Sequence, residues 1–155
     1  MQIIGKQIWE QAGEAEYPYK EIEAILGSVI RLPVKYWKPR MLFFGAEDRE
    51  LLDLTSGRFP AGQVTKKKRP VFSIESLPQR SGFRVCPCSS QIPYRKKKYR
   101  YIEKDCQLMH TGHVTDRKSY LIEEVSFNIP PSVASRLRFY GEVPKECLKS
   151  GKGKG

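Results

Sequence analysis

The chain has 155 residues, 39% of them hydrophobic and 29% charged, with a formal net charge of +11 at pH 7. This length predicts one domain with additions and an ordinary core, and the clustered positive charge favours a polyanionic partner over a purely solubilising role. No signal-peptide pattern opens the chain and no apolar run has the length of a membrane helix. We therefore expect a cytoplasmic protein without membrane association.

The four cysteines do not suggest a disulfide scaffold in a chain of this size. Cys86 and Cys88 are spaced to point the same way on one extended segment, whereas Cys106 and Cys147 are far apart in the sequence. This usage indicates a reducing compartment.

The first 68 residues divide into three segments. Residues 1–26 are predicted to form an N-terminal extension, a short amphipathic helix packed on the domain, with Pro18 in its first turn. Residues 27–34 are predicted to form a first strand. The turn-rich stretch 35–68, with a helical turn or two from Glu47 to Leu54, is interpreted as a long insertion that is functional or carries its own structure.

A hairpin follows, built from apolar runs at 71–74 and 83–86 with a turn around Pro78 and Gly82. If the two runs pair, Arg69 at the start of one lies near Ser89 and Ser90 at the end of the other. A guanidinium beside two hydroxyls is suited to bind phosphate or another anion.

Basic residues interleave with tyrosines in the next segment, residues 92–104. Single-stranded nucleic acid would use the charges for phosphates and the rings for bases, but an edge strand protected by lysines has the same composition. The expected RNA contacts, including the basic run before the hairpin, are Lys66, Lys67, Lys68, Arg95, Lys96, Lys97, Lys98 and Tyr99.

The remaining segments are a strand at 120–125, a strand or mixed turn at 132–140, and a turn into a short closing helix at 141–148. The Lys/Gly tail, 149–155, is expected to be disordered. Several short strands with one short helix at each end predict a mainly-β fold, a compact and partly closed antiparallel barrel over residues 27–148.

Three segments of this barrel resemble the MazF/PemK/Kid family of toxins from toxin–antitoxin modules. Gly27-Ser-Val-Ile resembles the family's opening strand, Lys68-Arg-Pro-Val its Arg-Pro strand, and Gly82-Phe-Arg-Val-Cys-Pro-Cys-Ser-Ser-Gln its Pro-x-(Thr/Ser)-(Thr/Ser) signature. Weaker similarities occur at Glu123-Glu-Val and at Gly141-Glu-Val-Pro. Together the resemblance covers residues 27–34 and 68–148.

The resemblance implies an SH3-like barrel, a homodimer and cleavage of single-stranded RNA without a metal or other cofactor, in which a 2′-hydroxyl attacks the adjacent phosphate. It also implies an acidic, partly disordered antitoxin that competes for the RNA groove. Arg69 would offset charge on the phosphate or act as an acid, Ser89 and Ser90 would hold the phosphate, and Glu123 would stand where some members have Asp.

The chain departs from the family at two positions near this acid. Leu121 stands where the family often has Arg, and Ser126 and Phe127 occupy a region where a basic residue is expected. His110 and His113 are candidates for the missing proton donor. We include His110 among the expected catalytic residues.

Three alternatives are compatible with the same residues. One is a catalytically silent barrel that binds nucleic acid or an antitoxin-like peptide. Another is a zinc site that would use thiolates and imidazoles from Cys86, Cys88, Cys106, His110 and His113. Because Cys-x-Cys within a strand is not the usual zinc knuckle and buried cysteines commonly pack as small apolar groups, no metal is expected. The third, Ser89 as an acyl-transfer nucleophile, lacks a Gly-x-Ser-x-Gly elbow.

Overall fold

The computed structural model describes residues 31–60, 64–78, 82–91 and 98–152. The helix expected in residues 1–26 lies outside these ranges, as do Arg95, Lys96 and Lys97.

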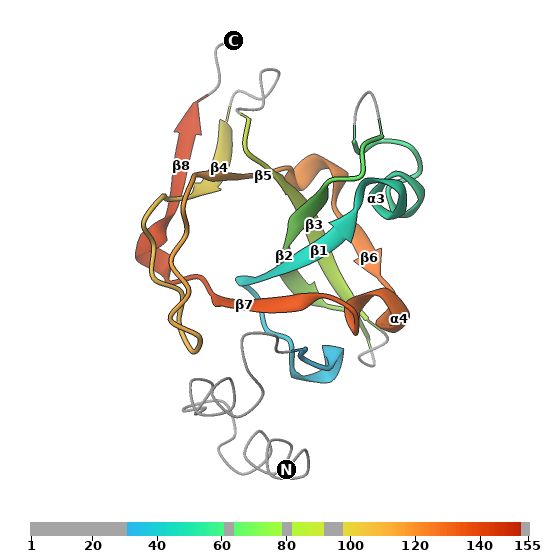
Figure 1. Cartoon of the computed structure of the whole chain (residues 1–155), viewed down its shortest axis with the longest axis horizontal. Helices are drawn as coiled ribbons and strands as arrows, with labels where there is room; N and C mark the ends of the chain where they lie inside the picture. The colour runs from blue at the N-terminus through green and yellow to red at the C-terminus, as the bar shows by residue number, and fades with distance from the viewer. Residues whose placement is uncertain (1–30, 61–63, 79–81, 92–97, 153–155) are drawn as a thin grey trace.

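Eight strands in the described residues form one antiparallel sheet in the order β7-β1-β2-β3-β5-β4-β8, with β6 paired to β3 (Figure 1). The sheet curls so that β4 and β8 lie apart from β1 and β2, with β5 joining them to β3. The expected mainly-β, partly closed antiparallel fold is confirmed. The strands are β1 (Met41–Glu47), β2 (Lys68–Ser76), β3 (Phe83–Ser89), β4 (Lys98–Ile102), β5 (Ser119–Leu121), β6 (Phe127–Ile129), β7 (Arg138–Glu142) and β8 (Leu148–Lys152).

The helical elements are short and lie between strands. They are η1 (Val34–Tyr36), α3 (Asp48–Leu54), η3 (Glu123–Val125), α4 (Pro131–Ala134) and η4 (Lys145–Cys147). The helical turns predicted from Glu47 to Leu54 are confirmed as α3, which begins with a reciprocal capping box between Glu47 and Glu50. None of the helices in the described ranges is long and apolar enough to cross a bilayer.

The predicted hairpin is confirmed as β2 and β3. Val71 pairs with Pro87 and Phe72 with Cys86, in the register that the alternating apolar residues require. The turn needs glycine at position 82, because a Cβ there would stand 2.8 Å from the carbonyl oxygen of Ile129.

Side chains on the two faces of the curled sheet belong to two separate cores, because successive residues of a strand point to opposite faces. Val71 and Val85 lie in a core with Phe43 and Phe139. Phe72 lies on the other face, in a core inside the curl whose members also include Leu42, Cys86, Cys88, Ile102, Leu108 and Leu121. The β2–β3 hairpin is therefore covered on both faces, by one core on each.

The stretch 35–68, expected to be an insertion, supplies β1, which lies between β7 and β2 in the sheet. Its sequence, Met-Leu-Phe-Phe-Gly-Ala-Glu, has apolar residues at nearly every position because both of its faces are covered. The register with β2 shifts at Gly45, between Phe44 and Ala46.

The two ends of the barrel differ from expectation. In the strand expected at 27–34, the described residues from Arg31 to Pro33 have no regular structure and Val34 opens η1. The closing helix is only the 3-10 turn η4, and the expected disordered tail instead forms β8 as far as Lys152. β8 pairs with β4 over five residue pairs, so this edge of the sheet is occupied by the chain's own C-terminal segment.

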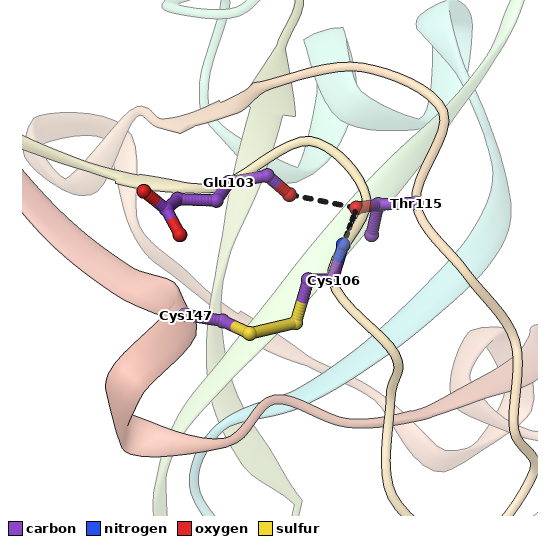
Figure 2. Close-up of a disulfide and its surroundings, with 4 residues drawn as sticks. All are labelled: Glu103, Cys106, Thr115 and Cys147. Atoms are coloured by element: carbon purple, nitrogen blue, oxygen red, sulfur yellow. Dashed lines mark hydrogen bonds between the residues drawn. A yellow bond between two sulfur atoms is a disulfide. The ribbon is translucent and has the colours of Figure 1, made fainter.

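A disulfide joins Cys106 to Cys147 and corrects the expectation of four reduced thiols. Figure 2 shows the hydroxyl of Thr115 beside it, donating to the carbonyl oxygen of Glu103 and accepting from the backbone N–H of Cys106. The bridge therefore fixes the segment 103–118 to the start of β8. Cys86 and Cys88 are free, and both lie in the core inside the curl, which agrees with the prediction that they point the same way from one extended segment.

Candidate functional site

The first feature of the site is a cavity of about 560 Å³. Arg69 from β2 and Ser89 and Ser90 from the end of β3 contribute to its wall, although they are about twenty residues apart in the sequence. The remaining wall residues come from β1, β2, β3, β7, the basic run before β2, and the segment that leads into β5 together with the first residue of β5: Leu42, Phe44, Lys67, Lys68, Pro70, Cys88, His113, Val114, Thr115, Asp116, Arg117, Ser119 and Tyr140.

The guanidinium of Arg69 is bound by a carboxylate. Its Nε donates to Oδ1 of Asp48 at 2.5 Å, and its Cζ lies 5.2 Å from the ring centroid of Phe59. Asp48 is fully buried and also accepts hydrogen bonds from the N–H and the hydroxyl of Thr65. A second donor, Nη2, lies 3.5 Å from Oδ2 of Asp48. The contact fixes the position of the guanidinium, but two of its nitrogens already donate to Asp48.

The pKa of Asp48 reflects this setting. Burial raises the pKa of the carboxyl, but the hydrogen bonds from Arg69 and Thr65 and the charge of Arg69 together outweigh burial, so the pKa is below its ordinary value. Asp48 stays ionised near neutral pH and the pair remains a closed ion pair.

The strand register separates the two serines. Continuing the β2–β3 pairing two residues past Val71 and Pro87 puts Arg69 opposite Ser89, on the same face of the sheet. Ser90 lies just past the end of β3, where the chain bends. The Oγ of Ser89 accepts a hydrogen bond from the N–H of Gln91 at 3.1 Å, and the side chain of Ser90 is exposed.

The segment 111–118 supplies groups that the choice of His110 missed. His113 lines the cavity and its ring lies 4.4 Å from that of Tyr140, and Arg117 adds a second guanidinium to the wall. The sequence indicated both histidines as proton donors. Their relative placement depends on the tight turn at Thr111 and Gly112, which no periodic pattern describes.

His110 is not among the residues that line this cavity. Its Nε2 lies 2.9 Å from Oε1 of Glu142, and the same carboxylate is 3.5 Å from Lys38 Nζ and from Arg40 Nη2. Burial raises the pKa of Glu142. The hydrogen bond with His110 and the nearby cations lower it by more than burial raises it, so the pKa is below its ordinary value. The network fastens β7 to the 38–40 turn and to the segment carrying His110.

This network predicts acid sensitivity. A carboxyl with a lowered pKa in the folded state contributes stability that is present above its ordinary pKa, 4.5 for Glu142, and is lost as the pH falls through the lowered value. We expect Glu142→Gln to lose about 1–2 kcal/mol of unfolding free energy at pH 7. Below pH 5 its unfolding free energy should fall less steeply with pH than that of wild type. It should still fall to some extent, because Asp48 contributes a dependence of the same sign. Urea unfolding of both proteins across that range measures it. Parallel curves with a constant offset would contradict this role.

Glu123 is separated from the first cavity. Its Oε1 accepts from Nε of Arg100 at 2.6 Å, and both residues line a second cavity of about 720 Å³. Lys98 and Tyr99, two of the expected RNA contacts, line that second cavity, whereas Lys67 and Lys68 line the first. Lys66 is exposed and lies outside the described walls of both.

The cysteines of the alternative zinc site are not available as ligands. Cys106 is bonded to Cys147, so its sulfur is not a free thiolate. Burial first, and nearby negative charge second, raise the pKa of the Cys86 and Cys88 thiols far above the ordinary cysteine range. These two thiols therefore pack as small apolar groups in the core inside the curl.

No protein-family model, curated protein or solved structure matches this chain.

Proposed function

We propose that the protein binds single-stranded RNA at the first cavity and cleaves it by attack of a 2′-hydroxyl on the adjacent phosphate. One observation carries the proposal: Arg69, Ser89 and Ser90, which the resemblance to MazF/PemK toxins singles out, contribute to the wall of one cavity. Lys67, Lys68 and Arg117 line the same cavity, and their charges suit a phosphodiester.

The chemistry requires a proton acceptor, a proton donor and positive charge. The O2′–P bond forms and the P–O5′ bond breaks, so the 2′-hydroxyl loses a proton, the departing O5′ gains one, and a 2′,3′-cyclic phosphate remains. His113 is the histidine in the cavity, and imidazole is the side chain best suited to both transfers near neutral pH. Ser89 and Ser90 would donate to phosphate oxygens, and Arg117 would offset charge on them.

A second candidate is RNA binding without cleavage. It is favoured by the contact of Arg69 with Asp48, which engages the guanidinium, and by the positions of His110 and Glu123, which belong to separate ion pairs. On this alternative the cavity holds phosphate and no proton transfer follows.

The proposed partners follow from the same charge pattern. An acidic, extended antitoxin segment would compete with RNA for the basic cavity, since both present negative charge to Lys67, Lys68 and Arg117. We propose in addition a homodimer and, because RNA is the substrate, a cytoplasmic location, where the Cys106–Cys147 disulfide would be an unusual feature.

Incubation of the purified protein with a long single-stranded RNA in EDTA tests the proposal. We expect discrete fragments with 2′,3′-cyclic phosphate ends, and a cleavage rate reduced by about 10²-fold or more in His113→Ala, because general acid–base catalysis contributes about 10²–10⁴-fold. His110→Ala is the matched control: the same side chain is removed three residues away, in the Glu142 network, and cleavage should persist.

Three outcomes separate the candidates. Fragments from both wild type and His113→Ala at equal rates would exclude His113 as the proton-transfer group. Binding to the RNA without fragments would support the silent module. Neither binding nor fragments would refute both.

A further inference from the structure

Three tyrosines form a cluster on one face of the sheet formed by β4, β5 and β8. The ring centroids of Tyr99, Tyr101 and Tyr120 are 5.6–6.1 Å apart in all three pairs. Tyr120 is buried at 7% exposure, whereas Tyr99 and Tyr101 are only half-buried. The cluster thus has a buried base and two partly open rings.

The cluster continues the row that contains the proposed phosphate site. Ser89 pairs with Tyr120 across β3 and β5, and Tyr120 pairs with Tyr101 across β5 and β4. Because paired residues share a face, the order across the strands is Arg69, Ser89, Tyr120 and Tyr101. Strands are spaced by about 4.8 Å, so Tyr101 lies about 10 Å from Ser89 across the sheet.

Positive charge accompanies the rings. The Nζ of Lys118 lies 5.1 Å from the ring centroid of Tyr101, and Lys149 pairs with Tyr101 from the other side, on β8. The side chains of Lys118 and Lys149 are both exposed. Aromatic faces beside exposed ammonium groups are what a single strand of nucleic acid requires, rings for the bases and charges for the backbone.

The ring of Tyr99 has room against β8 because its partner on that strand is a glycine. Tyr99 pairs with Gly151, and a Cβ at that position would lie 2.7 Å from the Cζ atom of the tyrosine. The ring therefore lies against the backbone of β8, which holds it beside Tyr101 and Tyr120.

We propose that Tyr99 and Tyr101, supported by Tyr120, form a platform on which bases of single-stranded RNA stack next to the phosphate held at Arg69 and Ser89. This inference rests on the proposed function and names the base-binding part of the site. Packing within the sheet accounts for the buried Tyr120, but two half-exposed tyrosines flanked by lysines present faces to a ligand.

Two oligomers of equal length, oligouridylate and its abasic counterpart, test the platform by fluorescence-anisotropy titration at fixed salt. Tyr101→Leu should bind oligouridylate about 5- to 150-fold more weakly, because one stacked base is lost, and should bind the abasic oligomer as wild type does. Tyr101→Phe keeps the ring and should bind as wild type. Lys118→Gln is a control for contacts with the RNA backbone, and it should weaken the binding of both oligomers equally.

A loss of equal size on both oligomers, or no loss on either, in Tyr101→Leu would overturn the platform while leaving RNA binding intact. Failure of the wild type to bind either oligomer would overturn the proposed function with it. If Tyr101→Leu does not fold by circular dichroism, ultraviolet crosslinking of wild type to 5-iodouracil RNA decides: adducts on Tyr99 or Tyr101 support the platform, and adducts confined to other residues overturn it.

Discussion

Arg69→Ala is expected to lower the free energy of unfolding by about 3–5 kcal/mol, because it leaves the fully buried carboxylate of Asp48 without its cationic partner. Thr65 would still donate to Asp48, but neutral hydrogen bonds do not replace the lost charge. Urea unfolding at pH 7, followed by circular dichroism, measures the loss.

A matched pair of variants separates the ion pair from the packing of Arg69. The double variant Asp48→Asn with Arg69→Met removes both charges and keeps a long side chain over Phe59. It should be more stable than Arg69→Ala, since no buried charge is left unpaired. A loss below about 1 kcal/mol in Arg69→Ala would mean that Asp48 is solvated or protonated when alone.

The same contact affects how an inactive Arg69→Ala protein should be interpreted. Lost cleavage in that variant alone does not distinguish a missing phosphate ligand from a disturbed fold. Asp48→Asn alone is informative in the opposite direction, since it releases the guanidinium from a charged acceptor and should strengthen RNA binding if Arg69 contacts phosphate.

Cys106→Ala is expected to cost about 2–4 kcal/mol of unfolding free energy under oxidising conditions, because the bridge closes 41 residues of chain and so restricts the unfolded state. The effect should reach the first cavity, since the bridged segment continues through Thr115 to Arg117 in its wall. Urea unfolding with and without a reductant measures the contribution.

The reductant supplies the control. It should destabilise wild type to about the level of Cys106→Ala and leave the variant unchanged. Cys86→Ala removes a buried free thiol but keeps the bridge, so reductant should destabilise it by about as much as it destabilises wild type. An effect of reductant on Cys106→Ala would show that the loss does not come from this bridge.

The hairpin was predictable from the sequence because its pattern is local. Apolar runs stand on both sides of a turn marked by Pro78 and Gly82, so strand, turn and register follow from a few neighbouring residues. The approach of Arg69 to Ser89 and Ser90 follows from that register alone, and α3 was likewise marked by the spacing of its leucines.

Other parts of the site depend on contacts between distant segments. Nothing near Cys106 indicates Cys147, and nothing near Arg69 indicates that Asp48, in the supposed insertion, faces it. The choice between His110 and His113 was decided by a turn that points one toward Glu142 and the other into the cavity. The Lys/Gly tail becomes a strand only because β4 offers an unpaired edge.

The sequence by itself determined the positive charge, the mainly-β class and the hairpin that carries Arg69, Ser89 and Ser90, because composition and alternation act over a few residues. Only the tertiary structure decided which carboxylate neutralises Arg69, which histidine enters the cavity and how the tyrosines of β4 and β5 line up with Ser89. Those relations join residues far apart in the chain, so the closure of the sheet sets them and no local pattern encodes them.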